Sequence, residues 1–336
     1  MRKLLTMVIA ASSVVFASIV TGQESSSTPP LRLIGSIDRL DSSLDAIVPQ
    51  DARLQVLATG HKWTEGPVWV PSLNALLYSD IPNNAIYRWS SGAPSSVWLK
   101  PSGYTGQATS GPGSNGLLVD GEGGLVLAQH GDRRVARLIG SLKTPRPAFE
   151  TLADKFDGKR FNSPNDIARH SNGDLYFTDP PYGLGQGMED PLKELDFQGV
   201  YRLTSDGTVT LLIDDLPRPN GIAFSPDEHV LYVADSDKER GVIMAYPVQA
   251  DGNLAEGEVF YETWGDGMAV DQQGNLYVAG PGHGVMILSP EGTHLGSLNT
   301  TEPTSNCAFG EDGKTLFITS NMNLLRVRLN VKGVGF

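Results

Sequence analysis

PNDIARHSNGDLYFTDP, residues 164–180, shows the unit from which most of the chain is built. A small polar pair precedes a short apolar strand, a turn with Asn and Gly follows, and a second strand is rich in Leu, Tyr and Phe. Related stretches occupy 65–81, 114–130, 219–236, 265–280 and 305–320. Each is followed by another strand pattern, and the copies begin roughly 40–55 residues apart, a spacing typical of one four-stranded propeller blade.

Six copies predict an all-β fold, a six-bladed β-propeller with four-stranded antiparallel blades around a central channel. A tandem of β-sandwiches is the alternative, and the even repeat along the chain counts against it. The stretches LRLIGSIDRL (31–40) and LQVLATG (54–60) precede the first copy. We expect them to supply an outer strand that closes the ring with the C-terminal blade.

The N-terminus has the pattern of an export signal. Arg2 and Lys3 precede a mostly apolar run from Leu4 to Val20, and small residues follow at Thr21 and Gly22. We therefore predict a signal peptide at 1–22, a polar linker at 23–34, and a propeller domain at 35–336. The location would be periplasmic or secreted, with no membrane attachment after signal removal. A short membrane anchor is the alternative.

Composition restricts the partners and the kinds of site. The formal net charge is -12, from 26 Lys and Arg against 38 Asp and Glu, and an acidic surface argues against nucleic acid as a partner. Cys307 is the only cysteine, so no intrachain disulfide and no site of several thiolates can form. The oligomeric state is left open by the sequence.

The start of the first strand in each repeat should lie at one end of the channel. That position holds Glu65, Asn115, Asn165, Asn220, Asp266 and Asn306. All six carry side-chain oxygen, and hard cations such as Ca²⁺ take carboxylate and amide oxygens as ligands. Any one Asn alone can instead be a turn former, because Asn before Gly is a common turn signal. Convergence of all six favours a ring of oxygen ligands.

The phrases WTEGPVW, FNSPNDI, YFTDPPYG, PNGIAFSPD and DGMAVD resemble the gluconolactonase and senescence-marker-protein family of six-bladed lactone hydrolases. The resemblance runs from about Gly35 to Leu329. It implies a divalent metal held by Glu65, Asn165, Asn220 and Asp266. We expect Ca²⁺, with Mg²⁺, Mn²⁺ or Zn²⁺ as alternatives.

The resemblance also implies metal-dependent hydrolysis of a small-molecule lactone, such as gluconolactone, to its hydroxy acid. Asp266 is the family-based candidate for the catalytic base. The competing candidates are a metal-bound hydroxide and His130, which follows a strand in LVLAQHGDRR. A structural role for His130 is the plainer alternative. We predict substrate contacts from Asn115, His130, Asp179, Tyr182 and Asn306.

Two other functions stay open. A related metal enzyme could act on an aryl lactone or an organophosphate, and a propeller can also be a binding module without catalysis. The polarity of the pocket should separate the enzyme alternatives, since sugars need several hydroxyl partners.

Overall fold

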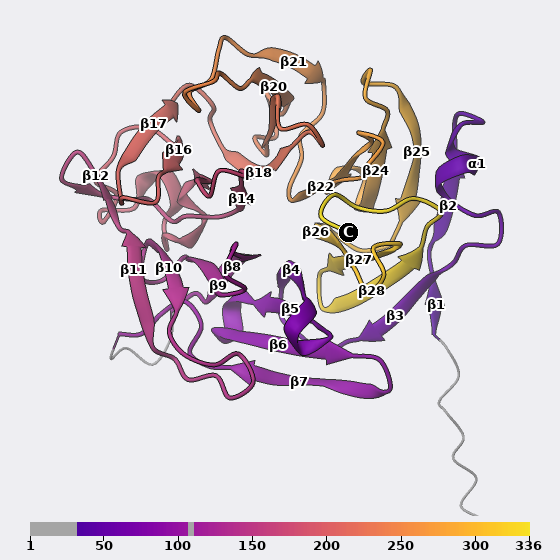
Figure 1. Ribbon diagram of the computed structural model, residues 1–336, viewed down its shortest axis with the longest axis horizontal. Coiled ribbons are helices and arrows are strands. Elements are labelled where there is room, and N and C mark those ends of the chain that lie inside the picture. The colour runs from indigo at the N-terminus through magenta and orange to yellow at the C-terminus, as the bar shows by residue number, and fades with distance from the viewer. Residues whose placement is uncertain (1–31, 107–110) are drawn as a thin grey trace, which may run out of the picture. The chain divides into compact units, whose positions relative to one another are not determined.

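The computed structural model describes residues 32–106 and 111–336, so the predicted signal peptide and most of the predicted linker lie outside the described residues. Within these ranges the chain forms six antiparallel sheets of four or five strands, arranged as blades around a common centre (Figure 1). The predicted six-bladed β-propeller is confirmed. The first strand in the described residues is β1 (Leu33–Ile34).

Each blade has an innermost strand and successively more peripheral ones. The innermost strands are β4 (Thr64–Val70), β8 (Ser114–Val119), β14 (Ile167–Arg169), β18 (Pro219–Phe224), β22 (Met268–Val270) and β26 (Thr304–Gly310). The second strands are β5 (Ala75–Asp80), β9 (Leu125–Gln129), β15 (Leu175–Asp179), β19 (Val230–Asp235), β23 (Leu276–Ala279) and β27 (Thr315–Ser320). We number the blades one to six in the order of these innermost strands.

The peripheral strands complete the sheets. The third strands are β6 (Ala85–Ser90), β10 (Arg134–Leu138), β16 (Gly199–Leu203), β20 (Ile243–Pro247), β24 (Gly284–Leu288) and β28 (Asn323–Arg328). The fourth strands are β7 (Ala93–Leu99), β11 (Phe149–Ala153), β17 (Val209–Ile213), β21 (Glu258–Tyr261), β25 (His294–Asn299) and β3 (Leu54–Ala58). Short additional elements are the hairpin β12 (Lys155–Phe156) and β13 (Lys159–Arg160), the helix α1 (Leu44–Ile47), and 3₁₀ turns at Pro71–Leu73, Ile81–Asn83, Pro181–Gly183, Gly187–Glu189 and Pro281–His283.

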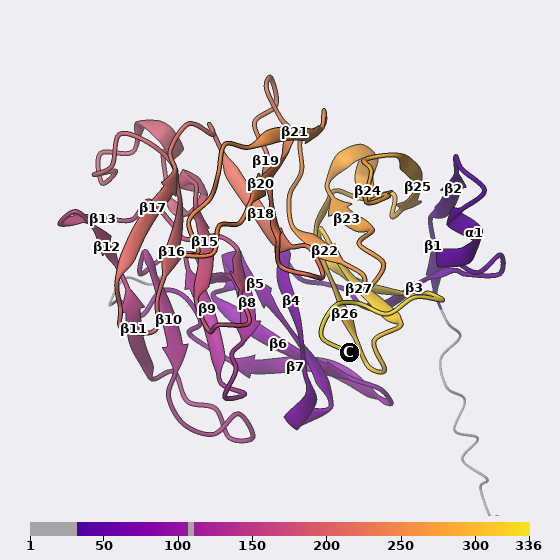
Figure 2. The ribbon, with the colours of Figure 1, turned by 45° about the horizontal axis from the view of Figure 1, so that its top comes forward.

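The N-terminal strands join the last two blades rather than one. β3 pairs antiparallel with β28 and closes blade six, as predicted, and β1 (Leu33–Ile34) pairs with β3. β2 (Ser36–Arg39) instead pairs with β25 of blade five, where both views place it (Figures 1 and 2). Gly35 lies between them with φ +68°, and a Cβ there would lie 1.8 Å from the Asn299 carbonyl oxygen. A glycine is therefore needed where the chain crosses from one blade to the next.

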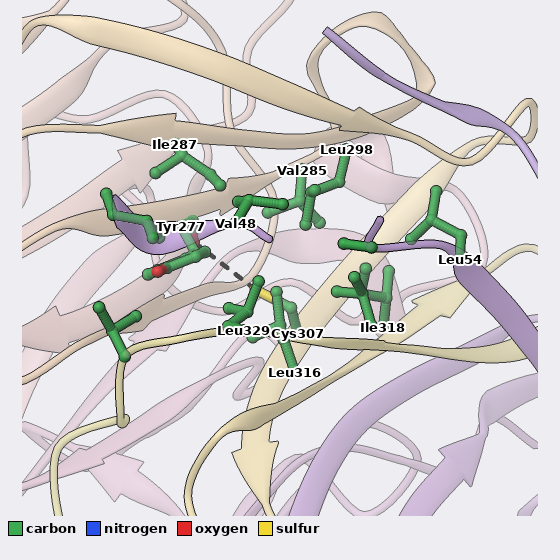
Figure 3. Close-up of a cluster of buried hydrophobic side chains, with 14 of the residues drawn as sticks. Val48, Leu54, Tyr277, Val285, Ile287, Leu298, Cys307, Leu316, Ile318 and Leu329 are labelled. Atoms are coloured by element: carbon green, nitrogen blue, oxygen red, sulfur yellow. Dashed lines mark hydrogen bonds between the residues drawn. The ribbon is translucent and has the colours of Figure 1, made fainter. Parts of the chain in front are cut away.

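The second strand of each blade is buried along almost its whole length. Neighbouring blades cover both of its faces, so the sequence there reads as an apolar run rather than as an alternating one. One cluster packs blade five against blade six and the N-terminal segment through Tyr277, Leu298, Leu316 and Leu54 (Figure 3). Cys307 lies in this cluster, with its Sγ 3.6 Å from the Tyr277 carbonyl oxygen, and burial raises the pKa of its thiol.

Helical structure is short throughout the described ranges. Among residues 32–106 and 111–336, no helix combines the length and the apolar character that crossing a membrane requires.

Candidate functional site

Five of the six equivalent repeat positions line one cavity of about 550 Å³ at one end of the channel: Glu65, Asn115, Asn165, Asn220 and Asp266. Each lies at or just before the start of an innermost strand. The repeat therefore brings together residues that are up to 201 positions apart in the sequence. All four predicted metal ligands are in this set.

Hydrogen bonds between adjacent blades hold the main chain around the cavity. The Ser79 hydroxyl donates to the Asn115 carbonyl at 2.8 Å, the Gly116 N–H donates to the Asn165 carbonyl at 2.8 Å, and the Thr178 hydroxyl donates to the Asn220 carbonyl at 2.6 Å. The other three blade pairs are joined by Gly265 N–H to Asp235 carbonyl, Gly267 N–H to Ser305 carbonyl, and Ser305 hydroxyl to Thr64 carbonyl. Every blade is thus tied to both neighbours near the site.

The two carboxyl groups of the site, those of Glu65 and Asp266, lie in a poorly solvated part of the protein. Glu65 is 3% exposed, whereas Asp266 keeps partial access to the cavity. Burial, followed by the charge of Asp266, raises the pKa of Glu65. Burial, followed by the charge of nearby Asp166, raises the pKa of Asp266. Like charges in a poorly solvated site repel one another, so a bound cation would stabilise the ionised forms.

The amide groups leave oxygen atoms for a ligand. The Asn220 Nδ2 donates to the Ser236 Oγ at 3.3 Å, which leaves its Oδ1 for other partners. The Asn115 Nδ2 lies 3.3 Å from the His130 Nε2, and within the described part of the chain its buried Oδ1 has no hydrogen-bond partner. Buried acceptors are normally satisfied, so an unpaired one at a cavity wall indicates a binding role.

This set of donors fits a hard divalent cation. Two carboxylates and two amides supply four oxygen ligands, and a cation of this class accepts more, from water or substrate. In the described ranges no three His, Cys, Asp or Glu side chains are grouped as a metal site. Binding of a cation in this cavity would therefore need the amide oxygens of Asn165 and Asn220 in addition to the carboxylates of Glu65 and Asp266.

His130 lies on the cavity wall and is only 2% exposed. Burial lowers the pKa of its imidazole to about 4, so the ring is neutral near pH 7. Gly183 lies directly against it, because a Cβ there would be 2.8 Å from the His130 Cβ. His130 can therefore exchange hydrogen bonds with a ligand without carrying charge.

Tyr182, which we predicted as a substrate contact, also lines the cavity. Its hydroxyl is 2.6 Å from the Ser236 Oγ, and the Arg218 guanidinium lies 5.9 Å from its ring centroid. The ring is 42% exposed, so a ligand in the cavity can reach it.

Two other residues that we predicted as substrate contacts, Asp179 and Asn306, are not among the residues that line this cavity. Asp179 does not line this cavity, since its carboxylate turns to the backbone N–H groups of Asn162 and Ser163. Asn306 faces a second cavity, of about 330 Å³, and its Oδ1 accepts the Cys307 N–H at 2.8 Å. Local hydrogen bonds thus occupy both side chains.

The sequence reasoning missed the aromatic wall formed by Trp63 and Trp264. Each stands two residues before a predicted metal ligand, in WTE and WGD, and this shared offset is a signal that could have identified them. Ser236, Lys238 and His283 also line the cavity and were not predicted. The lining of the site therefore combines polar and aromatic side chains.

Comparison with known proteins shows the family to which the chain belongs. The model of the SMP-30/Gluconolactonase/LRE-like region matches residues 63–322. The chain belongs to this family. A gluconolactonase of Zymomonas mobilis is 40% identical over 318 residues, covering 89% of this chain and 88% of that protein.

Solved structures of the family agree with the fold. The structure of a gluconolactonase from Xanthomonas campestris has a TM-score of 0.78 and 31% identity, covering 89% of this chain and 97% of that one. A calcium-binding protein, regucalcin, from Agrobacterium tumefaciens has a TM-score of 0.66 and 20% identity, covering 84% and 94%. At that identity the second likeness concerns the fold alone.

Proposed function

We propose that this member of the SMP-30/gluconolactonase family hydrolyses a sugar lactone with the help of a divalent cation, most simply Ca²⁺. The observation that carries the proposal is the convergence of Glu65, Asn165, Asn220 and Asp266 on one cavity. The similarity to the Zymomonas and Xanthomonas gluconolactonases supports the choice of substrate class.

In this proposal the four residues hold the cation through their side-chain oxygens. When bound, such a cation acts as a Lewis acid toward the lactone carbonyl oxygen. Asn115 and His130 lie beside the donors and offer a free amide oxygen and a neutral imidazole to the hydroxyls of the sugar. Trp63 and Trp264 flank the cavity, where a ring face can pack and water is excluded.

The chemical change is the addition of one water molecule. The water oxygen bonds to the carbonyl carbon, the acyl carbon–ring oxygen bond breaks, and the ring oxygen leaves with a proton as the hydroxyl of the product acid. Two side chains in the cavity can accept the proton of the attacking water, the Asp266 carboxylate and the His130 imidazole. His130→Gln tests the imidazole by itself, whereas Asp266→Asn changes a proposed metal ligand together with a candidate base.

Hydrolysis of glucono-1,5-lactone, followed by acid release with and without chelator, tests the proposal. We expect chelator to abolish turnover, added Ca²⁺ to restore it, and Asp266→Asn to lower kcat/KM by at least about 100-fold. Asp227→Asn, at an exposed turn, is the matched control and should retain activity. Full activity in chelator and in Asp266→Asn would refute the metal-hydrolase mechanism.

The aromatic wall favours one other candidate substrate. Trp63, Tyr182 and Trp264 could equally pack against the ring of an aryl lactone. Comparing dihydrocoumarin with glucono-1,5-lactone under the same conditions decides between them. A higher kcat/KM for dihydrocoumarin would replace the sugar substrate and leave the catalytic assignment in place.

A further inference from the structure

Three blades end their second strand with an aspartate: Asp80 on β5, Asp179 on β15 and Asp235 on β19. We call these residues the strand-end aspartates. Each is at most 1% exposed, and none lines the 550 Å³ cavity. Buried carboxylates are rare without specific partners, so their hydrogen bonds indicate what they do.

Asp179 makes the shortest contacts of the three with backbone N–H groups. Its Oδ2 accepts the Asn162 N–H at 2.7 Å, and its Oδ1 accepts the Ser163 N–H at 2.7 Å. These two residues stand three and two positions before Asn165. One carboxylate thus fixes two consecutive peptide groups directly ahead of a proposed metal ligand.

Asp80 and Asp235 make the same kind of contact in their own blades. The Asp80 carboxylate accepts the Lys62 N–H at 3.3 Å and the Trp63 N–H at 3.4 Å, three and two residues before Glu65. The Asp235 Oδ1 accepts the Arg218 N–H at 3.1 Å, two residues before Asn220. The offset from the ligand is therefore shared by all three blades.

The other blades end their second strands with Gln129, Ala279 and Ser320, none of which is charged. Gln129 donates to the Ser102 carbonyl at 2.7 Å, and Ser320 donates to the Pro303 carbonyl at 3.2 Å. Blades two and six supply no proposed metal ligand, and blade five supplies Asp266, which is itself charged. The strand-end aspartates thus occur in the three blades that supply Glu65, Asn165 and Asn220.

We propose that Asp80, Asp179 and Asp235 are positioning residues that orient the metal ligands Glu65, Asn165 and Asn220 by fixing the backbone ahead of each one. This inference rests on the proposed metal-dependent function. A ligand oxygen must be held within about 0.5 Å of its productive place, and the residue that orients it governs affinity for the ion. Replacement of such outer partners typically weakens metal binding by about 10–100-fold.

An Asp→Asn change at these positions keeps the size of the side chain but not its pattern of acceptors. Asparagine has one carbonyl oxygen, and its NH₂ group faces a backbone N–H that needs an acceptor. The effect should follow the quality of the wild-type contacts. We therefore expect the largest loss in Asp179→Asn, which can keep only one of two contacts of 2.7 Å, and a smaller loss in Asp80→Asn. Asp235→Asn should have the smallest effect, because the Oδ1 of Asp235 alone accepts the Arg218 N–H.

The test measures Ca²⁺ affinity of the full chain by isothermal titration calorimetry, beside kcat on glucono-1,5-lactone. Asp271→Asn is the matched control. Asp271 is 0% exposed and accepts the Gln273 and Asn275 N–H groups at 2.9 Å each, at the turn between β22 and β23 and outside the cavity. It should lose thermal stability like the other variants and keep its Ca²⁺ affinity.

We expect Asp179→Asn to raise the Kd for Ca²⁺ by about 10–100-fold and to recover most of its kcat at saturating Ca²⁺. Unchanged affinity in folded Asp179→Asn and Asp80→Asn, or a loss as large in Asp271→Asn, would overturn the inference. If Asp179→Asn does not fold, Asp80→Asn decides, because both carboxylate oxygens of Asp80 accept N–H groups. Wild-type protein that binds no divalent cation would instead refute the proposed function itself, and the inference with it.

Discussion

Lowering the pH from 7.5 to 5 should destabilise the protein through the burial of one imidazole. Burial lowers the pKa of His130 from 6.5 to about 4. In the unfolded chain this ring takes a proton below pH 6.5, whereas in the folded chain it resists protonation until about pH 4. Between these values the unfolded state binds more protons, so the free energy of unfolding falls as the pH falls.

The size of the effect follows from the two pKa values. The difference between the two pKa values corresponds to about 3 kcal/mol of unfolding free energy once His130 is protonated in both the folded and the unfolded state. About 2 kcal/mol of this stability is lost between pH 7.5 and pH 5. Other groups also titrate over this range. The comparison must therefore be made against a variant that lacks only the imidazole.

Urea unfolding of wild type and His130→Gln at pH 7.5 and pH 5, in chelator to exclude metal binding, measures the difference. The wild type should lose about 2 kcal/mol more than the variant. His229→Gln is the control, since the His229 side chain is 82% exposed, and it should behave as wild type. Equal pH dependence in wild type and His130→Gln would show that His130 protonates freely in the folded protein and would refute its burial as a neutral ring.

Glu65→Gln should raise the melting temperature of the metal-free protein, because it removes one of two carboxylates that repel each other. It should also abolish the stabilisation of the wild type by Ca²⁺, which is about 2.7 kcal/mol at 100 times the Kd. Calorimetric scans with and without Ca²⁺ measure both changes in melting temperature. Gly221→Ala should lower the free energy of unfolding by about 1–3 kcal/mol and weaken Ca²⁺ binding, because the new Cβ would lie 2.1 Å from the Asp266 carbonyl oxygen. Unchanged stability in unfolding experiments and unchanged Ca²⁺ affinity in titrations would contradict this packing. Leu54→Ala, in the closing strand β3, should lower the free energy of unfolding by about 2–5 kcal/mol. Leu33→Ala, at a residue that is 52% exposed, should stay within about 0.5 kcal/mol of wild type in the same unfolding experiment.

The placement of the main site could be predicted from the sequence because it depends on backbone periodicity. Equivalent positions in repeats converge wherever the blades are arranged radially, so Glu65, Asn165, Asn220 and Asp266 share a cavity without any knowledge of side-chain directions. The position of the stretches 31–40 and 54–60 ahead of the first repeat also predicted an outer strand that closes the ring, and β3 (Leu54–Ala58) pairs with β28 in this way.

Side-chain direction is what the periodicity could not supply. Asp179 stands at the channel end of its strand, and only the nearby N–H groups of Asn162 and Ser163 turn its carboxylate away from the cavity. Asn306 is similarly occupied by the Cys307 N–H. Such local partners depend on loop conformation, which the spacing of the repeats does not determine.

The closure of blade six by β3 makes assembly of the site a late event in folding. Glu65 follows the closing strand directly, and its blade meets blade six only when residues 54–58 pair with residues 324–326, almost the whole chain length away. Contacts of such long sequence separation form slowly, because the loop entropy is lost before the contacts are gained. A nascent or partly folded chain would therefore hold Glu65 on blade one, tied to blade two by the Ser79–Asn115 hydrogen bond, while the ring between blades six and one is still open. Tight binding of the ion would then require the closed ring. The ion would stabilise the completed propeller rather than direct its assembly.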